Sequence, residues 1–175
     1  PGTHPTKGSY FTRGTTKDEY ARYSEEGAVY VRNMERLQKK FDTARKIAPQ
    51  PVRRPAAKPS RYGVLYFGST SPAMDEALER LEADGHHVNA MRVRAFPFSQ
   101  AVEDFIHEHD KVFVVEQNRD GQLRSMIMNE FTLDARKLVP VLHYDGTPIT
   151  ARFIAADIAK KLGQLKVVPF EKAAS

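Results

Sequence analysis

The sequence predicts an α/β fold with a doubly wound, mostly parallel sheet, preceded by a helical N-terminal arm. From residue 62 onward, short apolar runs alternate with segments of helical period, which is typical of strands alternating with helices. The run Val112-Phe113-Val114-Val115 is continuously apolar, as expected for a buried parallel strand. Right-handed crossovers between such strands place helices on both faces of the sheet.

Four strands are expected, each followed by a helix-forming segment. They cover residues 64–67, 88–93, 112–115 and 138–142. The intervening helices are expected after Ser71-Pro72, after Ser99, around residues 122–130 and after Thr150. Serine and threonine are good N-caps, and proline suits the first helical turn. The last helix is expected to end before Gly163.

The N-terminal arm contains a predicted amphipathic helix. Residues 1–16 are rich in Gly, Thr and Pro and indicate irregular structure. Thr16 and Glu19 match a capping box, which predicts a helix start. The best helical stretch covers residues 24–48, where apolar residues recur at spacings of three and four: Tyr30, Met34, Leu37, Phe41 and Ala44. This stripe has to be buried against the main domain or another subunit.

Three regions follow from these patterns. Residues 1–48 form an interdomain segment with the helix, 49–61 a linker rich in proline and cations, and 62–175 the α/β domain. The chain has no initiator methionine, and residues 1–61 lack a sheet-forming pattern of their own. Both points favour a fragment of a longer polypeptide.

Composition excludes several kinds of protein. The chain has no cysteine, so it forms no disulfides and supplies no thiolate to zinc or to an iron–sulfur cluster. No apolar run approaches the roughly 20 residues of a membrane span, and no signal peptide is recognisable. A cytoplasmic setting fits.

The net charge of +5 is unevenly distributed. Residues 1–61 contain 14 Lys or Arg against 6 Asp or Glu, whereas residues 62–175 contain 13 against 16. A basic arm is compatible with nucleic acid, a membrane surface or an acidic partner. We favour a solvated linker and helix face, because the cations are interspersed with acids and no nucleic-acid motif accompanies them.

The turn after the first strand is a candidate anion site. It opens a helix, whose first amides point outward and can hold a phosphate. The residues concerned are Gly68, Ser69, Thr70 and Ser71. The turn lacks both a Walker lysine and a G-x-G-x-x-G pattern. A simple strand-to-helix turn with a serine cap is therefore the preferred interpretation.

Two further loops follow strands at the same edge of the sheet. Residues 94–98 place two phenylalanines around a proline, which is compatible with a satellite core or, slightly less readily, a contact surface. Residues 116–122 are densely polar; they either bind a ligand or subunit or tie down their own turn. The interface candidates are Arg94, Phe96, Pro97, Phe98, Glu116, Gln117, Asn118, Arg119 and Gln122.

No catalytic or metal constellation is recognisable. The six histidines match no zinc spacing, and exposed histidines near helix ends are the preferred interpretation for most of them. His4 lies in a loop rich in donors and is compatible with an approach to an active site or with the loose end of a fragment. The chain has no Gly-x-Ser-x-Gly elbow and no Cys–His pair.

Several stretches taken together resemble one family, the 2-oxoacid:ferredoxin oxidoreductases, and in particular the 2-oxoglutarate type. In order along the chain they are 2–5, 33–41, 68–70, 94–98, 114–123 and 144–150. Their order and spacing resemble the later part of the α subunit. The resemblance implies a transketolase-C-terminal-like domain over residues 62–175, preceded by the segment that joins it to a pyrimidine-binding domain.

The resemblance implies oxidative decarboxylation of a 2-oxoacid to an acyl-CoA, with electrons passed to ferredoxin. Thiamine diphosphate, Mg²⁺ and an iron–sulfur cluster are expected in the complete complex and none in this chain. The expected partners are a β subunit and a second α subunit, with ferredoxin and CoA acting on the whole complex; nucleic acid and membrane are not expected. The implied role is scaffolding, and His4 and Arg13 are candidates for an approach to the active site.

Two other interpretations remain open. One is a stand-alone module of flavodoxin-like shape that binds a small anion at residues 68–71. The other is the equivalent domain of a different thiamine enzyme, such as a transketolase or a 2-oxoacid dehydrogenase β chain.

Overall fold

The structure, a computed structural model, describes residue 4 and residues 16–167. Backbone contacts divide the chain into two compact units, residues 1–47 and residues 48–175.

The first unit contains one long helix, α1 (Gly27–Ile47). The helix expected over residues 24–48 is therefore confirmed, but the predicted start at Thr16–Glu19 is wrong. There the Asp18 carboxylate accepts hydrogen bonds from the amides of Tyr20 and Arg22, which closes a turn instead of a helix. Ala21 in this turn has a φ of 61°, which interrupts any helical run.

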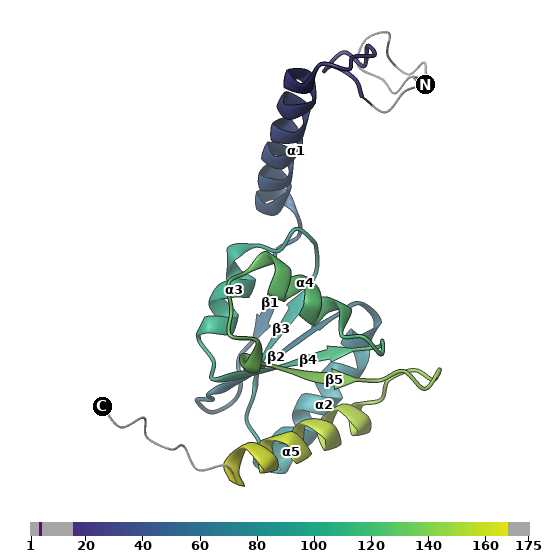
Figure 1. The fold of residues 1–175 in the computed structure, drawn as a ribbon. Helices are drawn as coiled ribbons and strands as arrows, with labels where there is room; N and C mark the ends of the chain where they lie inside the picture. Colours follow the sequence, from purple (N-terminus) through teal and green to yellow (C-terminus); the bar gives the residue numbers. More distant parts are fainter. Residues whose placement is uncertain (1–3, 5–15, 168–175) are drawn as a thin grey trace, which may run out of the picture. The chain divides into compact units, whose positions relative to one another are not determined.

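The second unit is built on a five-stranded sheet of order β1-β3-β2-β4-β5 (Figure 1). The strands are β1 (Val52–Arg54), β2 (Tyr62–Phe67), β3 (Asn89–Val93), β4 (Lys111–Glu116) and β5 (Leu138–Leu142). All neighbours are parallel except β1 and β3. The chain moves from β2 outward to β3 and then crosses to β4 on the other side. The predicted α/β fold with a doubly wound, mostly parallel sheet is confirmed.

Strand β1 was not expected, because residues 49–61 were predicted to be a linker. Its backbone is extended as predicted, but it also pairs antiparallel with β3, Arg53 opposite Met91. Arg53 forms two hydrogen bonds with Glu108, and Arg54 pairs with Asp75 at 2.6 Å. These pairs are exposed and contribute little energy, so backbone pairing is the main reason that the strand forms.

Helices cover both faces of the sheet. They are α2 (Ser71–Ala83), α3 (Gln100–His107), α4 (Gln122–Glu130) and α5 (Ala151–Val167), with short 3₁₀ turns η1 (Gly68–Thr70) and η2 (Ala135–Lys137). α2 and α5 lie on one face and α3 and α4 on the other (Figure 1). Each face has its own core: Leu81 and Ile154 belong to the first, Phe105 and Ile127 to the second.

The helix ends differ from the expectations in three places. Ser71 lies inside α2, and its N-cap Thr70 makes no capping bond. Ser99 is the N-cap of α3, but its buried hydroxyl has no hydrogen-bond partner among the described residues. Thr150 does cap α5, through a 3.2 Å bond from the Phe153 amide to its hydroxyl. Helix α5 continues through Gly163, because Leu162 still packs into the core.

The amino ends of the strands hold a buried histidine that was expected at the surface. His109 is 3% exposed, and its ring lies 4.4 Å from the Phe105 ring. Its Nδ1 lies 2.6 Å from the Phe105 carbonyl oxygen and its Nε2 2.8 Å from Nδ2 of Asn89. Both ring nitrogens are thus occupied, and His109 is part of the folded core. A cavity of about 330 Å³ beside it is lined by Arg53 and Glu108, which pair with each other.

Candidate functional site

The carboxyl ends of β2, β3, β4 and β5 meet at one edge of the sheet, and four loops leave from it. We call this the carboxyl edge: residues 67–71, 94–98, 116–122 and 143–150. Ligands of open α/β sheets bind at such an edge, at the point where the chain changes direction. Here that point lies between β2 and β4, between the loops that begin at Gly68 and Gln117.

The side chain of Gln117 connects the loops at that point. Its Nε2 donates to the hydroxyl of Ser69 at 3.0 Å and of Thr70 at 3.2 Å. Its Oε1 accepts from the amide of Ile149 at 3.4 Å. One side chain therefore joins three loops that are far apart in the sequence, and it occupies the position where a ligand of this fold class would bind.

The rest of the loop 116–122 mainly satisfies itself. Glu116 is fully buried, and its carboxylate accepts from the amides of Leu123 at 2.7 Å and Arg124 at 3.0 Å. These are first-turn amides of α4, which have no intrahelical acceptor. Asn118 donates to Glu116 and accepts from the amides of Asp120 and Gln122. Of the two interpretations offered for this loop, the structure therefore supports turn stabilisation for Glu116 and Asn118.

Arg119 and Gln122 lie on the outside of this loop. Both are exposed, and Arg119 pairs with the neighbouring Asp120 at 2.7 Å. Gly121 precedes α4 with a φ of 62° and allows the loop to turn back onto Glu116. Arg119 and Gln122 therefore stay candidates for contact with a partner, whereas Glu116 does not.

The loop 94–98 is divided between core and surface. Pro97 and Phe98 are buried, and Phe98 packs 6.1 Å from the Phe131 ring. Phe96 is 45% exposed and meets Phe98 edge-on at 5.2 Å. Arg94 beside it is exposed. The interface assignment is therefore wrong for Pro97 and Phe98, which complete the second core, and stays a prediction for Arg94 and Phe96.

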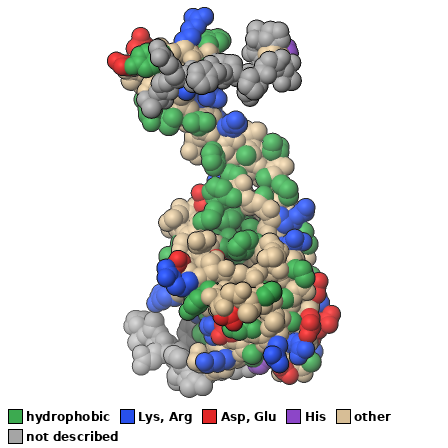
Figure 2. Space-filling view, turned by 90° about the vertical axis from the view of Figure 1, so that its right-hand side faces the viewer, with side chains coloured by type: hydrophobic (Ala, Val, Ile, Leu, Met, Phe, Trp, Pro, Cys, Tyr) green, Lys and Arg blue, Asp and Glu red, His purple; other side chains and the backbone are tan. Residues whose placement is uncertain are grey.

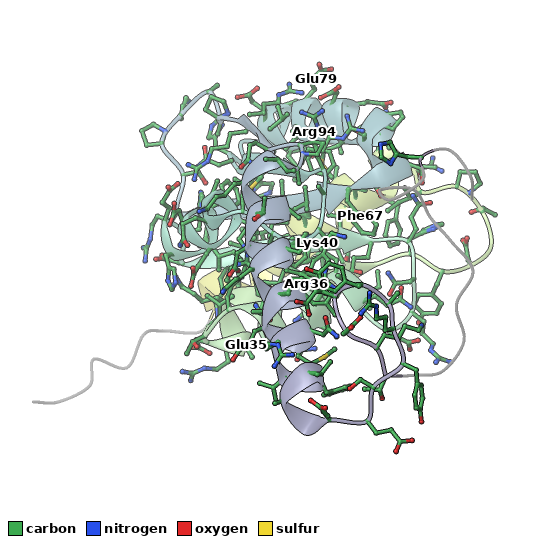
Figure 3. All side chains as sticks on the ribbon, turned by 90° about the horizontal axis from the view of Figure 1, so that it is seen from above. Glu35, Arg36, Lys40, Phe67, Glu79 and Arg94 are labelled. Carbon is green, nitrogen blue, oxygen red and sulfur yellow. The ribbon has the colours of Figure 1, made fainter. Side chains whose placement is uncertain are left out.

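One apolar residue of this edge was missed from the sequence. Phe67, the last residue of β2, is 39% exposed, although its strand run suggested burial. It lies at the carboxyl edge, as does Arg94 (Figure 3). Figure 2 looks onto this edge of the second unit and shows hydrophobic side chains on part of the face, with both Lys or Arg and Asp or Glu toward its sides. An exposed apolar patch with a charged border is a surface suited to protein contact.

The turn 68–71 offers little to an anion. Gly68 adopts a φ of 58° and starts the 3₁₀ turn η1, which runs directly into α2. The hydroxyl oxygens of Ser69 and Thr70 already accept from Gln117, and Thr70 is 2% exposed. These contacts favour the interpretation as a strand-to-helix turn.

The loop after β5 adds a second feature that sequence reasoning missed. The Asp145 carboxylate accepts from the amide and the hydroxyl of Thr147, and these bonds lower the pKa of Asp145. Nε2 of the buried His143 lies 3.4 Å from the same carboxylate. The Asp-Gly-Thr-Pro run is typical of a turn, but it does not indicate the contact between Asp145 and His143.

The remaining candidates form no reactive constellation. His4 is exposed, and Arg13 lies outside the described residues. The described part of the chain contains no group of three or more His, Cys, Asp or Glu side chains that would hold a metal. Nor does it contain a helix long and apolar enough to cross a membrane.

Two known oxidoreductases are similar to this chain over most of its length. No family model matches the chain. The α subunit of 2-oxoacid:ferredoxin oxidoreductase 2 from Aeropyrum pernix is 27% identical over 161 residues, which cover 89% of this chain and 25% of that protein. The structure of a 2-oxoglutarate:ferredoxin oxidoreductase from Magnetococcus marinus, determined with 2-oxoglutarate, coenzyme A and succinyl-CoA bound, matches with a TM-score of 0.76 and 25% identity. That match covers 93% of this chain and 28% of the Magnetococcus chain.

A split-gene transketolase matches with a TM-score of 0.47 and 19% identity over 65% of this chain and 41% of its own. The chain spans about a quarter of the length of the two oxidoreductase chains. The second unit, residues 48–175, makes up only 128 of the 175 residues. The Magnetococcus match covers 93% of the chain, so it also includes part of the first unit. The resemblance expected from the sequence motifs is confirmed. The chain is a domain like that of the α subunits of 2-oxoacid:ferredoxin oxidoreductases.

Proposed function

We propose that this chain is an assembly domain of the α subunit of a 2-oxoacid:ferredoxin oxidoreductase, with 2-oxoglutarate as the oxoacid. The complete enzyme would decarboxylate the oxoacid oxidatively, form an acyl-CoA and reduce ferredoxin. The observation that carries the proposal is the likeness to two such oxidoreductases over 89% and 93% of the chain. The choice of 2-oxoglutarate is supported by the activity of the Magnetococcus enzyme.

The residues of the chain do not fit the cofactors of the complete enzyme. An iron–sulfur cluster needs thiolates, and the sequence has no cysteine. Among the described residues, no group of three or more His, Asp or Glu side chains is placed to hold a metal ion. The iron–sulfur cluster would therefore be held elsewhere in the complex, and we assign no reaction step to this chain.

An assembly role is supported by the carboxyl edge. The polar side chains of Glu116, Gln117 and Asn118 form hydrogen bonds that hold the loops together. The exposed part of this edge includes Phe67, Arg94 and Phe96, beside the acidic Asp120 and Asp145. A rigid set of loops with this surface is suited to packing against the β subunit or a second α subunit.

The test uses the native polypeptide that carries this chain. An antibody against the chain would capture it from source cells, and the captured material would be assayed for viologen reduction that depends on both 2-oxoglutarate and CoA. We expect activity together with a co-captured β subunit, and antibody pre-absorbed with the purified chain as control should capture neither. Activity with another 2-oxoacid alone would overturn the substrate assignment. A captured intact polypeptide with no 2-oxoacid-dependent activity would overturn the proposal.

A further inference from the structure

The helix α1 carries an apolar stripe whose large side chains are partly exposed. The stripe consists of Tyr30, Met34, Leu37, Phe41 and Ala44, spaced four, three, four and three residues apart. Tyr30 is 50% exposed, Met34 42% and Leu37 38%. A row of large apolar side chains at this period is typical of a helix that packs against another surface.

The charges beside the stripe indicate what that surface is like. At about 100° of rotation per residue, the charged residues next to the stripe are the exposed Lys40 on one side and the half-buried Arg45, which has a contact within the chain, on the other. Glu35 and Asp42 lie farther round the helix. Figure 3 labels Arg36 and Lys40 along α1 and also Glu35. A surface that receives the stripe thus needs carboxylates along its border.

A second copy of the chain does not meet this requirement. In a parallel pair of α1 helices, Lys40 of one copy would face Arg45 of the other, and this would occur twice. α1 contains six Lys or Arg and only two Asp or Glu, so pairing two copies would bring like charges together. A different protein with acidic groups is the better occupant.

We propose that α1 docks through the stripe onto an apolar groove bordered by carboxylates on the partner subunit of the oxidoreductase. This inference rests on the proposed function, which supplies the partner. The match over 93% of the chain extends into the first unit, so part of this region has a counterpart in the Magnetococcus chain. Helix-in-groove docking of this kind is a general mode of protein recognition.

The test compares two neighbouring lysines in the complete α polypeptide co-expressed with its partner subunit. Lys40→Glu reverses a charge beside the stripe, whereas Lys39→Glu makes the same change on the opposite side of the helix. At low ionic strength we expect Lys40→Glu to raise the Kd of the two subunits about tenfold or more. Lys39→Glu should change it by less than about twofold. The difference should shrink at about 0.5 M salt, where charges are screened within a few ångströms.

A second variant tests the apolar contact. Leu37→Gln should raise the Kd at both salt concentrations, by about tenfold or more, without loss of helical circular dichroism. The inference is overturned if wild-type subunits associate and both Leu37→Gln and Lys40→Glu bind like wild type. It is also overturned if Leu37→Gln instead abolishes a dimer of this chain or lowers the Tm of the chain alone, since the stripe would then have another occupant. Failure of the wild-type subunits to associate at all would instead sink the proposed function.

Discussion

The carboxylate of Glu116 holds the start of α4 from a buried position. In Glu116→Gln, an NH₂ group replaces one of the two oxygens that accept from the amides of Leu123 and Arg124. We expect the free energy of unfolding to fall by about 1.5–3 kcal/mol, the usual range for a charge-assisted bond. Urea unfolding measures this. Asp120→Asn, an exposed control in the same loop, should change stability by less than about 0.5 kcal/mol; equal effects of the two variants would refute the assignment.

Two glycines offer a matched test of packing. A Cβ at Gly63 would lie 2.8 Å from Cε1 of Phe105 and 3.2 Å from Cγ of His109, whereas a Cβ at Gly27 would meet nothing within 4 Å. We expect Gly63→Ala to destabilise the protein by about 1–3 kcal/mol. Gly27→Ala should be neutral or stabilising by up to about 1 kcal/mol, because alanine restricts the unfolded chain. Thermal unfolding of both variants measures the difference, and a stable Gly63→Ala protein would contradict the packing described here.

The phenol of Tyr66 should titrate late. Burial raises its pKa, and the nearby Asp75 carboxylate raises that pKa further. Because the folded-state pKa is the higher one, the stability contributed by the neutral phenol is present below the unfolded pKa of about 10 and is lost as pH rises through the folded value. Alkaline absorbance titration should show a late component that disappears in Tyr66→Phe. The pKa of Tyr23 is raised too, by its bond to Glu25, and that component should persist.

At the level of elements, the loop 94–98 divides its two phenylalanines between two tasks. Phe98 is 2% exposed in the core of α3 and α4, so Phe98→Ala should destabilise the chain by about 3–5 kcal/mol. Phe96→Ala should cost less than about 1 kcal/mol in the chain itself but weaken assembly of the full α polypeptide. Denaturant unfolding and subunit titration measure the two effects. Equal loss of stability in the isolated chain would mark both residues as core.

The sequence predicted the elements whose signals are local. The apolar runs from Val64, Val112 and Leu138 all form strands, and the helix at residues 122–130 begins and ends where expected. Strand β1 was missed because Val52–Arg54 has no apolar alternation and forms through pairing with β3. The end of α5 was misjudged because packing of Leu162 outweighs the weak helix propensity of Gly163.

The carboxyl edge was less predictable than the strands that form it. Parallel strands imply that their loops meet, so the positions of residues 68–71, 94–98 and 116–122 followed from the fold class. Which side chains turn inward did not follow, because Phe96 and Phe98 have the same chemistry and differ only in their tertiary surroundings. The bonds of Gln117 to Ser69 and Thr70 likewise join positions nearly 50 residues apart, and no local pattern encodes them.

At the scale of the whole molecule, the chain should lack the cofactor chemistry of its relatives. We expect calorimetry of the isolated chain with millimolar thiamine diphosphate and Mg²⁺ to give no saturable heat, because the proposed assembly role leaves the cofactor to other parts of the complex. The complete captured enzyme serves as the positive control. Saturable binding of thiamine diphosphate by the isolated chain would contradict a role in assembly alone.

The two border strands of the sheet limit how the domain can associate. Strand β1 is only three residues long and carries Arg53 and Arg54, and strand β5 contains Pro140, which has no amide hydrogen to donate. Short, charged or proline-containing borders discourage a foreign strand from extending a sheet. A chain with these borders should resist fibril growth when it is produced without its partners. Recognition within the complex would then depend on side chains of helices and loops, where single substitutions can tune it.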